Sequence, residues 1–240
     1  MDPQNSIPMK GQPMKPTRIE LAKQMALEVG EFALLESQKT HEIHFKDSLS
    51  SDPVTDVDRS CEKMIVDAIK KHYPDDGIIG EEGGPYNSNT TNYWVIDPLD
   101  GTQNYMHRLP LYCVSICYVE HTKPQIGVIY APFFKELFVA ERGKGTTLNN
   151  LPIKVSDEIQ DFSRHFGTSA LSLAWVACGR LSYYKAHELF PWDFAAGALI
   201  VEEAGGIACT LENTPLAFFL PQSIFASNKK LKNKHFEGMK

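Results

Sequence analysis

The sequence has little that would suit a membrane, a secretion route or a nucleic acid. No stretch of its 240 residues is long enough and apolar enough to cross a bilayer. Residues 1–16 are polar and lack the apolar region of a signal peptide, so we expect a flexible tail on a cytoplasmic protein. The formal net charge is -6, and nucleic-acid binding usually requires a basic stripe. We therefore expect neither a membrane nor a nucleic acid as partner.

Cysteines are also few and poorly placed for chemistry. The five cysteines are spread widely and form no C-x-x-C pair, which argues against a zinc site. Cys113 and Cys117 lie in the apolar run 112–119, where we interpret them as small buried residues. The chemistry of this protein must therefore come from other side chains.

The pattern of apolar residues predicts an α/β protein built in layers. Hydrophobic content of 42% and charged content of 22% are ordinary for a globular chain. Helical spacing predicts helices over 17–37, 59–72, 168–179, 193–204 and from 228 onward. Short apolar runs predict strands over 93–96, 111–120, 125–130, 136–140, 207–210 and 223–227, with an antiparallel meander between 111 and 140. The irregular alternation favours a layered sandwich over a regular doubly wound sheet.

Acidic residues gather in a few short segments. They lie at residues 52–58, 80–84, 97–102 and 191–193. The third segment is the most informative, because a buried strand is predicted to end at Asp97 and Pro98 then forces a turn. Asp100 follows at once, so two carboxylates and a backbone carbonyl are crowded together. Such crowding is costly without a cation and suits the oxygen-seeking Mg²⁺.

The same segment offers contacts for a phosphate. Gly101 permits close approach of the backbone, and Thr102 offers a hydroxyl and an N–H to a phosphate oxygen. Acids at the first and fourth positions do not fit an EF-hand, which needs them at alternate positions. A single acid such as Asp52 is better interpreted as an exposed carboxylate, and helix capping is the alternative for Asp193.

Four motifs carry a resemblance to a known family. Asp97–Tyr105 reads D-P-L-D-G-T-Q-N-Y, and residues 192–206 run from W-D-F-A-A-G to E-A-G-G. Residues 52–58 and 80–82 add two shorter acidic motifs. Taken in their order along the chain, the four motifs resemble the signatures of the inositol monophosphatase family. The resemblance extends from about residue 18 to 229. The resemblance implies an αβαβα layered sandwich and a homodimer.

Carried across residue by residue, the resemblance also implies magnesium sites. A first ion would be held by Glu81, Asp97 and the carbonyl of Leu99. Asp97, Asp100 and Asp193 would hold a second ion, and Glu81 would help to hold a weaker third. The implied cofactor is therefore Mg²⁺, with two or three ions.

The resemblance further assigns the groups that act on the substrate. Thr102 and Asp58 would orient the attacking water, with Glu81 beside them as a catalytic metal ligand. The N–H groups of Gly101 and Thr102 would receive the phosphate. The predicted partner is thus a small phosphate ester.

The substrate pocket departs from the family pattern. Inositol-preferring members carry a glutamate shortly before the W-D motif, near the position of Lys185 in this chain. Lys185 would favour a second anionic group, with an ordinary solvated lysine as the alternative. Gly167, Thr168 and Ser169, at a predicted helix start, are expected to line the same pocket or to form a packing contact of small residues.

A second departure concerns the organisation of the chain. We divide it into a tail over 1–16, a half over 17–150 with most metal ligands, and a half over 151–240 that completes the site in one compact unit. The family carries a further strand and helix where this chain has only the connection 156–166. Either the chain has lost this strand and helix, or the sequence omits a stretch. We favour omission, because a true loss would leave apolar surface uncovered.

The sequence thus predicts a Mg²⁺-dependent, lithium-sensitive phosphomonoesterase acting on a small soluble ester that resembles inositol monophosphate. Broader action on fructose 1,6-bisphosphate, NADP or 3′-phosphoadenosine 5′-phosphate is the alternative. A catalytically silent metal- or partner-binding relative is a rival of a different class, disfavoured because every implied metal ligand is present. A two-metal nuclease would show basic or aromatic tracking surface, and the acidic balance gives little sign of it.

Overall fold

The fold is built around one large sheet. A computed structural model describes residues 15–39, 43–45, 53–159 and 161–237, so Asp52 and most of the predicted tail lie outside the described residues. The large sheet has eight strands in the order β10-β9-β8-β7-β6-β5-β3-β4, and only the β3–β5 pair is parallel. Its strands are β3 (Gly77–Gly80), β4 (Gly84–Tyr86), β5 (Asn92–Asp100), β6 (Cys113–Glu120), β7 (Lys123–Ala131), β8 (Glu136–Glu141), β9 (Gly145–Leu148) and β10 (Leu151–Pro152).

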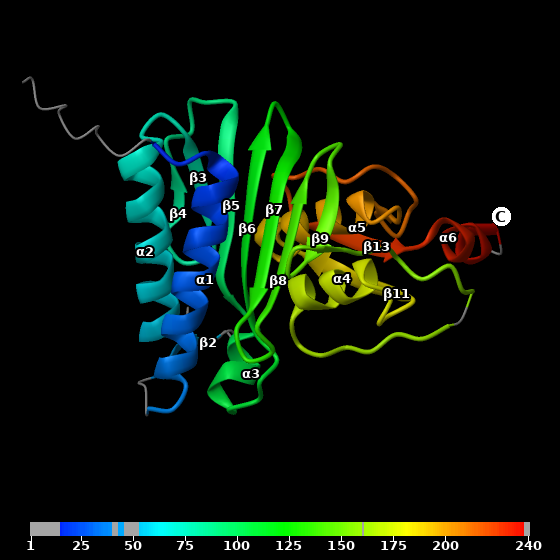
Figure 1. Ribbon diagram of the computed structural model, residues 1–240, viewed down its shortest axis with the longest axis horizontal. Coiled ribbons are helices and arrows are strands. Elements are labelled where there is room, and N and C mark those ends of the chain that lie inside the picture. Colours follow the sequence, from blue (N-terminus) through cyan, green and yellow to red (C-terminus); the bar gives the residue numbers. More distant parts are fainter. Residues whose placement is uncertain (1–14, 40–42, 46–52, 160, 238–240) are drawn as a thin grey trace, which may run out of the picture.

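Helices cover both faces of this sheet, and a smaller sheet follows (Figure 1). α1 (Arg18–Glu36) and α2 (Asp56–His72) pack on one face, and α4 (Ser169–Ala177) and α5 (Pro191–Glu203) pack on the other. Beyond α4 and α5 lies a three-stranded sheet of order β11-β13-β12, which α6 (Lys229–Glu237) contacts at β13. The layers therefore run α, β, α, β, α, and the predicted sandwich is confirmed. The other elements are β11 (Tyr183–Leu189), β12 (Ile207–Cys209), β13 (Gln222–Ser227), the short α3 (Thr102–Met106) and a hairpin of β1 (Ile43–Phe45) and β2 (Pro53–Thr55).

Two hydrophobic clusters, one on each face of the large sheet, join the layers. In β5, Trp94 and Ile96 belong to the cluster with α1 and α2, whereas Val95 belongs to the cluster with α4 and α5. Because both faces are covered, this strand reads as a continuous apolar run. Phe194 and Leu173 lie in the same cluster as Val95, so both predicted halves contribute to one core. Within the described part of the chain, no helix has the length and apolar character to span a bilayer.

The predicted helices and strands are present, but the end of β5 differs from the prediction. The strand predicted over 93–96 extends to Asp100. A shift in pairing register between Asp97 and Asp100 carries the strand past Pro98, so a bulge replaces the expected turn. The sequence pattern also misses β3, β4, β9 and β11, because these strands are short or carry polar residues on an exposed face.

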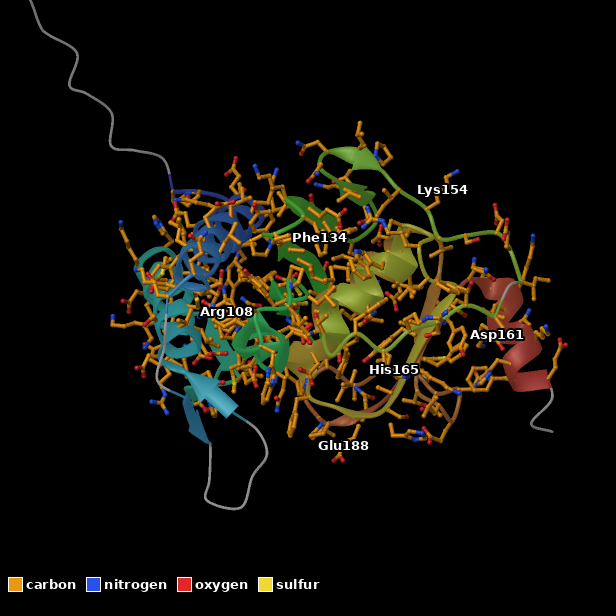
Figure 2. The ribbon with its side chains drawn as sticks, turned by 90° about the horizontal axis from the view of Figure 1, so that it is seen from below. Arg108, Phe134, Lys154, Asp161, His165 and Glu188 are labelled. Atoms are coloured by element: carbon orange, nitrogen blue, oxygen red, sulfur yellow. The ribbon has the colours of Figure 1, made fainter. Side chains whose placement is uncertain are left out.

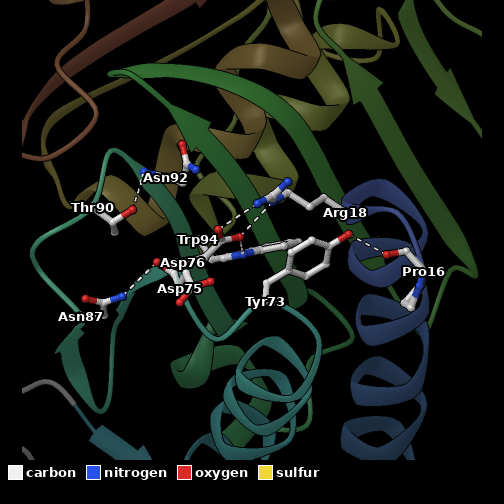
Figure 3. A network of polar contacts seen from close by, with 9 residues as sticks. All are labelled: Pro16, Arg18, Tyr73, Asp75, Asp76, Asn87, Thr90, Asn92 and Trp94. Atoms are coloured by element: carbon white, nitrogen blue, oxygen red, sulfur yellow. Dashed lines mark hydrogen bonds and ion pairs between the residues drawn. The ribbon is translucent and has the colours of Figure 1, made fainter. Parts of the chain in front are cut away.

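Asp76 fixes the start of α1 to the sheet (Figure 3). It lies between α2 and β3 and is 3% exposed. Its carboxylate accepts hydrogen bonds from Nε and Nη2 of Arg18 and from Nε1 of Trp94, each at 2.9 Å. Tyr73 completes the network by donating its hydroxyl to the carbonyl of Pro16 at 2.6 Å. The helical layer formed by α1 and α2 is thus held against β5 by polar contacts as well as by its core.

Replacing Asp76 by alanine tests this anchor. The change leaves the Arg18 guanidinium and the Trp94 indole without their acceptor. We expect a loss of about 1.5–3 kcal/mol in the free energy of unfolding, the range for hydrogen bonds to a charged group. Urea denaturation measures it. The exposed neighbour Asp75, replaced by alanine, is the control and should change stability by less than about 0.5 kcal/mol. Equal effects of the two variants would contradict the anchor.

Candidate active site

The candidate site lies where β5 ends. Asp97 and Asp100 flank the bulge, and both are buried, at 1% and 7% exposure. Gly101 follows with a φ of +100°, and a Cβ there would lie 2.7 Å from the carbonyl oxygen of Leu111. Both features require glycine. The chain can therefore leave the strand and begin α3 at Thr102, directly beside the two carboxylates.

Asp193 joins these two carboxylates from another layer. It lies in the first turn of α5, and its Oδ2 accepts the N–H of Phe190 at 2.8 Å. One oxygen each of Asp97, Asp100 and Asp193 lies within 4.8 Å of the others. Asp193 therefore caps its helix and also belongs to the cluster. Carboxylate oxygens are the ligands that Mg²⁺ takes, so this donor set fits such an ion.

The start of α4 orients Asp100. Oδ2 of Asp100 accepts the hydroxyl of Thr168 at 2.5 Å and the N–H of Ala170 at 2.7 Å. Oδ1 accepts the N–H of Ser169 at 3.2 Å. Backbone N–H groups in the first turn of a helix lack partners within the helix, and the helix dipole there favours negative charge. The second half of the chain thus positions a carboxylate that belongs to the first.

Burial and repulsion raise the pKa values of the clustered acids. Burial raises the pKa of Asp97 well above its usual range, and three neighbouring carboxylates add to this, Glu81 most strongly. Burial also raises the pKa of Asp100, against the hydrogen bonds from the start of α4. Glu81, in the turn between β3 and β4, is thus within electrostatic reach of the cluster. A bound divalent cation would relieve the repulsion among these groups.

Thr102 and Asp58 meet beside the cluster. The Thr102 hydroxyl lies 3.0 Å from Oδ1 of Asp58 and 3.2 Å from the carbonyl oxygen of Leu99. Asp58 lies in the first turn of α2 and is 2% exposed. Because these two oxygens can only accept, the threonine donates, and its lone pairs can accept a hydrogen from a third group.

The predicted pocket residues at the start of α4 lie beside Asp100. Thr168 is 3% exposed, and its hydroxyl is directed at Asp100. The Ser169 hydroxyl lies 2.9 Å from the hydroxyl of Tyr184. Gly167 has a φ of +72°, and a Cβ there would lie 3.1 Å from the side-chain amide of Asn104. Thr168 thus supports the acidic cluster, whereas Ser169 extends toward β11.

Lys185 is not brought to the cluster. Successive residues of a strand face opposite ways. Tyr184 faces inward, where it contacts Ser169, and His165, labelled in Figure 2, has its ring 5.9 Å from that of Tyr184. Lys185 faces the other way and lines a pocket of about 300 Å³ beside α6, together with Asp161. The expected contact of Lys185 with a substrate therefore disagrees with its position on the outer face of β11.

Sequence reasoning missed two residues near the site. Tyr184 contacts Ser169 because β11 is a strand, which the pattern did not predict. Glu62 is buried in α2 and contacts the turn that carries Glu81. The signal for Glu62 was its position four residues after Asp58, which places both acids on one face of the helix.

A layered αβαβα sandwich with a carboxylate cluster at the end of a central strand defines a sugar-phosphatase type of fold. The chain belongs to the inositol monophosphatase family, which it matches over residues 14–164 and 159–239. The sequence is 37% identical to Nus factor SuhB of Xylella fastidiosa, over 82% of each chain. It is 31% identical to a fructose-1,6-bisphosphatase/inositol-1-monophosphatase of Thermotoga maritima, over 88% of this chain and 91% of that one.

Solved structures give the same result for the fold. The extragenic suppressor protein suhB from Bartonella henselae superimposes with a TM-score of 0.86 at 30% identity, covering 92% of this chain and 97% of that one. Inositol monophosphatase from Anabaena (Nostoc) sp. PCC 7120 gives a TM-score of 0.81 at 32% identity, covering 92% and 94%. The family resemblance and the fold class are thereby confirmed.

The short connection before α4 coincides with a break in the family match. The family match is divided into two stretches, which overlap at residues 159–164. Ile159 and Phe162 are 48% and 42% exposed there, as expected if an element that would cover them is missing. The main chain is still anchored, since the N–H of Ser182 donates to the carbonyl of Phe162 at 2.8 Å. The interpretation as an omitted segment stays a prediction.

Asp97→Asn tests the repulsion within the cluster. The amide oxygen can still accept the N–H of Leu99, now at 3.0 Å from Oδ1, while one negative charge is lost. In EDTA we expect Tm to rise by about 2–4 °C, which corresponds to roughly 1 kcal/mol in a chain of this size. Mg²⁺ should raise the Tm of the wild type, because it binds only the folded chain, and should affect the variant much less.

Thermal unfolding in EDTA and in Mg²⁺ measures both effects. Asp67→Asn, which replaces an exposed carboxylate of α2, is the control. It should leave the Tm in EDTA and the response of Tm to Mg²⁺ unchanged. A wild-type Tm that does not respond to Mg²⁺ would count against a cation site.

Proposed function

We propose that this protein is a Mg²⁺-dependent phosphomonoesterase that hydrolyses a small soluble phosphate ester. The observation that carries the proposal is the cluster of buried Asp97 and Asp100 with half-buried Asp193, beside the Thr102–Asp58 pair. Membership of the inositol monophosphatase family supports a phosphatase in general. The metal, its ligands and the substrate are our proposal.

The acidic residues would hold the ions. Glu81, Asp97 and the carbonyl of Leu99 are the proposed ligands of one, and Asp97, Asp100 and Asp193 of another, with Glu81 at a weaker third. Bound Mg²⁺ supplies charge neutralisation of the phosphate and lowers the pKa of a coordinated water. Glu81 stays in the proposal because its charge acts on Asp97.

Thr102 and Asp58 would orient the attacking water. Asp58 accepts the hydroxyl hydrogen of Thr102, so the threonine oxygen presents its lone pairs and accepts a hydrogen from the water. The carboxylate of Asp58, which lies 3.0 Å from the threonine oxygen, would then receive the proton that the water loses. The N–H groups of Gly101 and Thr102 would bind the phosphate at the point where the positive φ of Gly101 brings the backbone close.

The residues around the cluster favour a wider range of substrates than inositol phosphate alone. Ala186, inward-facing like Tyr184, packs against the core and presents only a methyl group. Up to the register shift that follows Ala186, the inward face of β11 thus carries Tyr184 and Ala186, neither of which is a carboxylate. The name of the Thermotoga relative joins two activities, on fructose 1,6-bisphosphate and on inositol 1-phosphate. Inositol monophosphate-like esters are our first candidates, and fructose 1,6-bisphosphate, NADP and 3′-phosphoadenosine 5′-phosphate are the alternatives.

A catalytically silent, partner-binding relative is the rival of another class. The relative named Nus factor SuhB carries a name that states no substrate. Against this rival stands the complete proposed set, in which the Thr102–Asp58 pair is formed beside a cluster of carboxylates. A partner-binding role alone gives no physical reason to keep like charges buried together.

Phosphate release from a panel of esters tests the proposal. The panel contains inositol 1-phosphate, fructose 1,6-bisphosphate, NADP and 3′-phosphoadenosine 5′-phosphate, each with Mg²⁺ and with EDTA. We expect Mg²⁺-dependent release from at least one ester and inhibition by lithium. Asp100→Asn should lower kcat by at least about 100-fold, the scale for removing one group that stabilises transition-state charge. Asp67→Asn, which makes the same substitution at an exposed position, is the control.

Two results would overturn the phosphatase proposal. One is a folded wild-type protein that releases phosphate from none of the four esters. The other is a folded Asp100→Asn protein with near-normal activity. The first result would move the partner-binding alternative to first place.

The proposal includes a homodimer in the cytoplasm. Leu109 and Phe133 are 47% and 56% exposed and line a groove of about 330 Å³ with Tyr105 and Tyr112. The Phe134 ring packs edge-on against that of Phe133, and Figure 2 views the molecule from this end. An exposed apolar groove of this kind is typical of a surface that a partner covers. The family resemblance makes a second copy the proposed partner.

Phe133→Asp tests the dimer. The wild type should show about twice the chain mass of 27.0 kDa by light scattering, and the variant should show the chain mass, because a charge would be buried in the interface. Phe162→Asp, at an exposed phenylalanine of the 156–166 connection, is the control and should leave the mass unchanged. A wild type with the mass of one chain would contradict the dimer.

A further inference from the structure

Glu62 is a buried carboxylate outside the proposed ligand set. It lies in α2 and is 5% exposed. Its Oε2 accepts the N–H of Glu82 at 2.8 Å, and its Oε1 accepts the N–H of Gly83 at 2.5 Å. One side chain thus holds two consecutive backbone N–H groups of the turn between β3 and β4. Hydrogen bonds to a charged acceptor are the stronger kind.

The turn is shaped around this carboxylate. A Cβ on Gly83 would lie 2.5 Å from Oε1 of Glu62, and a Cβ on Gly80 would lie 2.7 Å from its Oε2. Any side chain at either position would push the carboxylate away. Neither glycine has a positive φ, so backbone conformation does not explain them. Contact with Glu62 does explain them.

The turn and the helix both lead to the candidate active site. Glu81 lies between the two glycines, and its charge acts on Asp97. Asp58 lies one helical turn before Glu62, on the same face of α2. In α2, Asp58 therefore accepts the hydroxyl of Thr102, and Glu62, one helical turn later, holds the turn that carries Glu81.

We infer that Glu62 is a positioning residue, which holds the turn so that the Glu81 carboxylate reaches the Mg²⁺ ions of the proposed site. The inference rests on the proposed function. Metal ligands need to be held within about 0.5 Å of their productive geometry. A turn with Gly80, Gly83 and Gly84 has a pliable backbone, so its shape has to be fixed from outside.

Glu62→Gln removes this support with little change in shape. The amide NH₂ group would face one of the two backbone N–H groups, so one hydrogen bond is lost and two donors oppose each other. The Mg²⁺ concentration for half-maximal phosphate release should rise by about 10–100-fold, as for other groups that orient metal ligands. At saturating Mg²⁺, kcat should fall less than about threefold. The Mg²⁺ dependence of Tm, measured without substrate, should shift in the same direction.

Gly83→Ala is the second variant and Asp67→Asn the control. The added methyl should displace the Glu62 carboxylate while keeping its charge, so we expect the same shift in Mg²⁺ dependence. This variant decides the question if Glu62→Gln does not fold. Asp67, exposed on the same helix, should cause no shift. A purely structural role for Glu62 would lower Tm equally at every Mg²⁺ concentration.

The outcomes separate this inference from the proposed function. If the wild type shows neither Mg²⁺-dependent phosphate release nor a Mg²⁺-dependent Tm, the proposed function fails and the role of Glu62 fails with it. If the wild type shows both, and the two variants keep their Mg²⁺ dependence within about twofold, only the positioning role is overturned.

Discussion

Repulsion among buried carboxylates at the end of β5 is the constraint on which this structure depends. Like charges this close are tolerated only where hydrogen bonds or cations compensate each one. Asp97 accepts the N–H of Leu99, Asp100 accepts donors from the start of α4, and Asp193 accepts the N–H of Phe190. These bonds orient the acids without neutralising them. The repulsion among them therefore persists, and a bound cation would relieve it.

The layered fold follows from the need to bring such groups together. β5 is an interior strand of the large sheet, between β3 and β6, so helices from both faces of the sheet can reach its end. From one face α2 contributes Asp58, and from the other α4 and α5 direct their N-terminal turns at the same place. Helix N-termini suit negative charge, so two of the layers stabilise the cluster electrostatically as well as through the core.

The chemistry and the choice of substrate belong to different parts of the chain. The proposed phosphate-handling groups come from segments of contiguous sequence around Asp58, Glu81, Asp97 and Asp193. The surroundings that would select an ester come from β11 and from the connection 156–166, where the chain departs from its family. Tyr184 and Ala186 there present no carboxylate to the cluster. A family match therefore supports the reaction class more firmly than the substrate.

The sequence by itself determined the main helices and strands, the layered class and the crowding of Asp97 and Asp100, because these depend on local spacing. It also showed the family through four short motifs. Only the tertiary structure decided that Asp193 lies within 4.8 Å of that pair and that Glu62 reaches the turn of Glu81. It also decided that Lys185 faces away from the cluster. The face that a strand residue occupies depends on pairing register and bulges. Contacts between residues far apart in the sequence depend on packing between layers. Neither can be read from the spacing of residues along the chain.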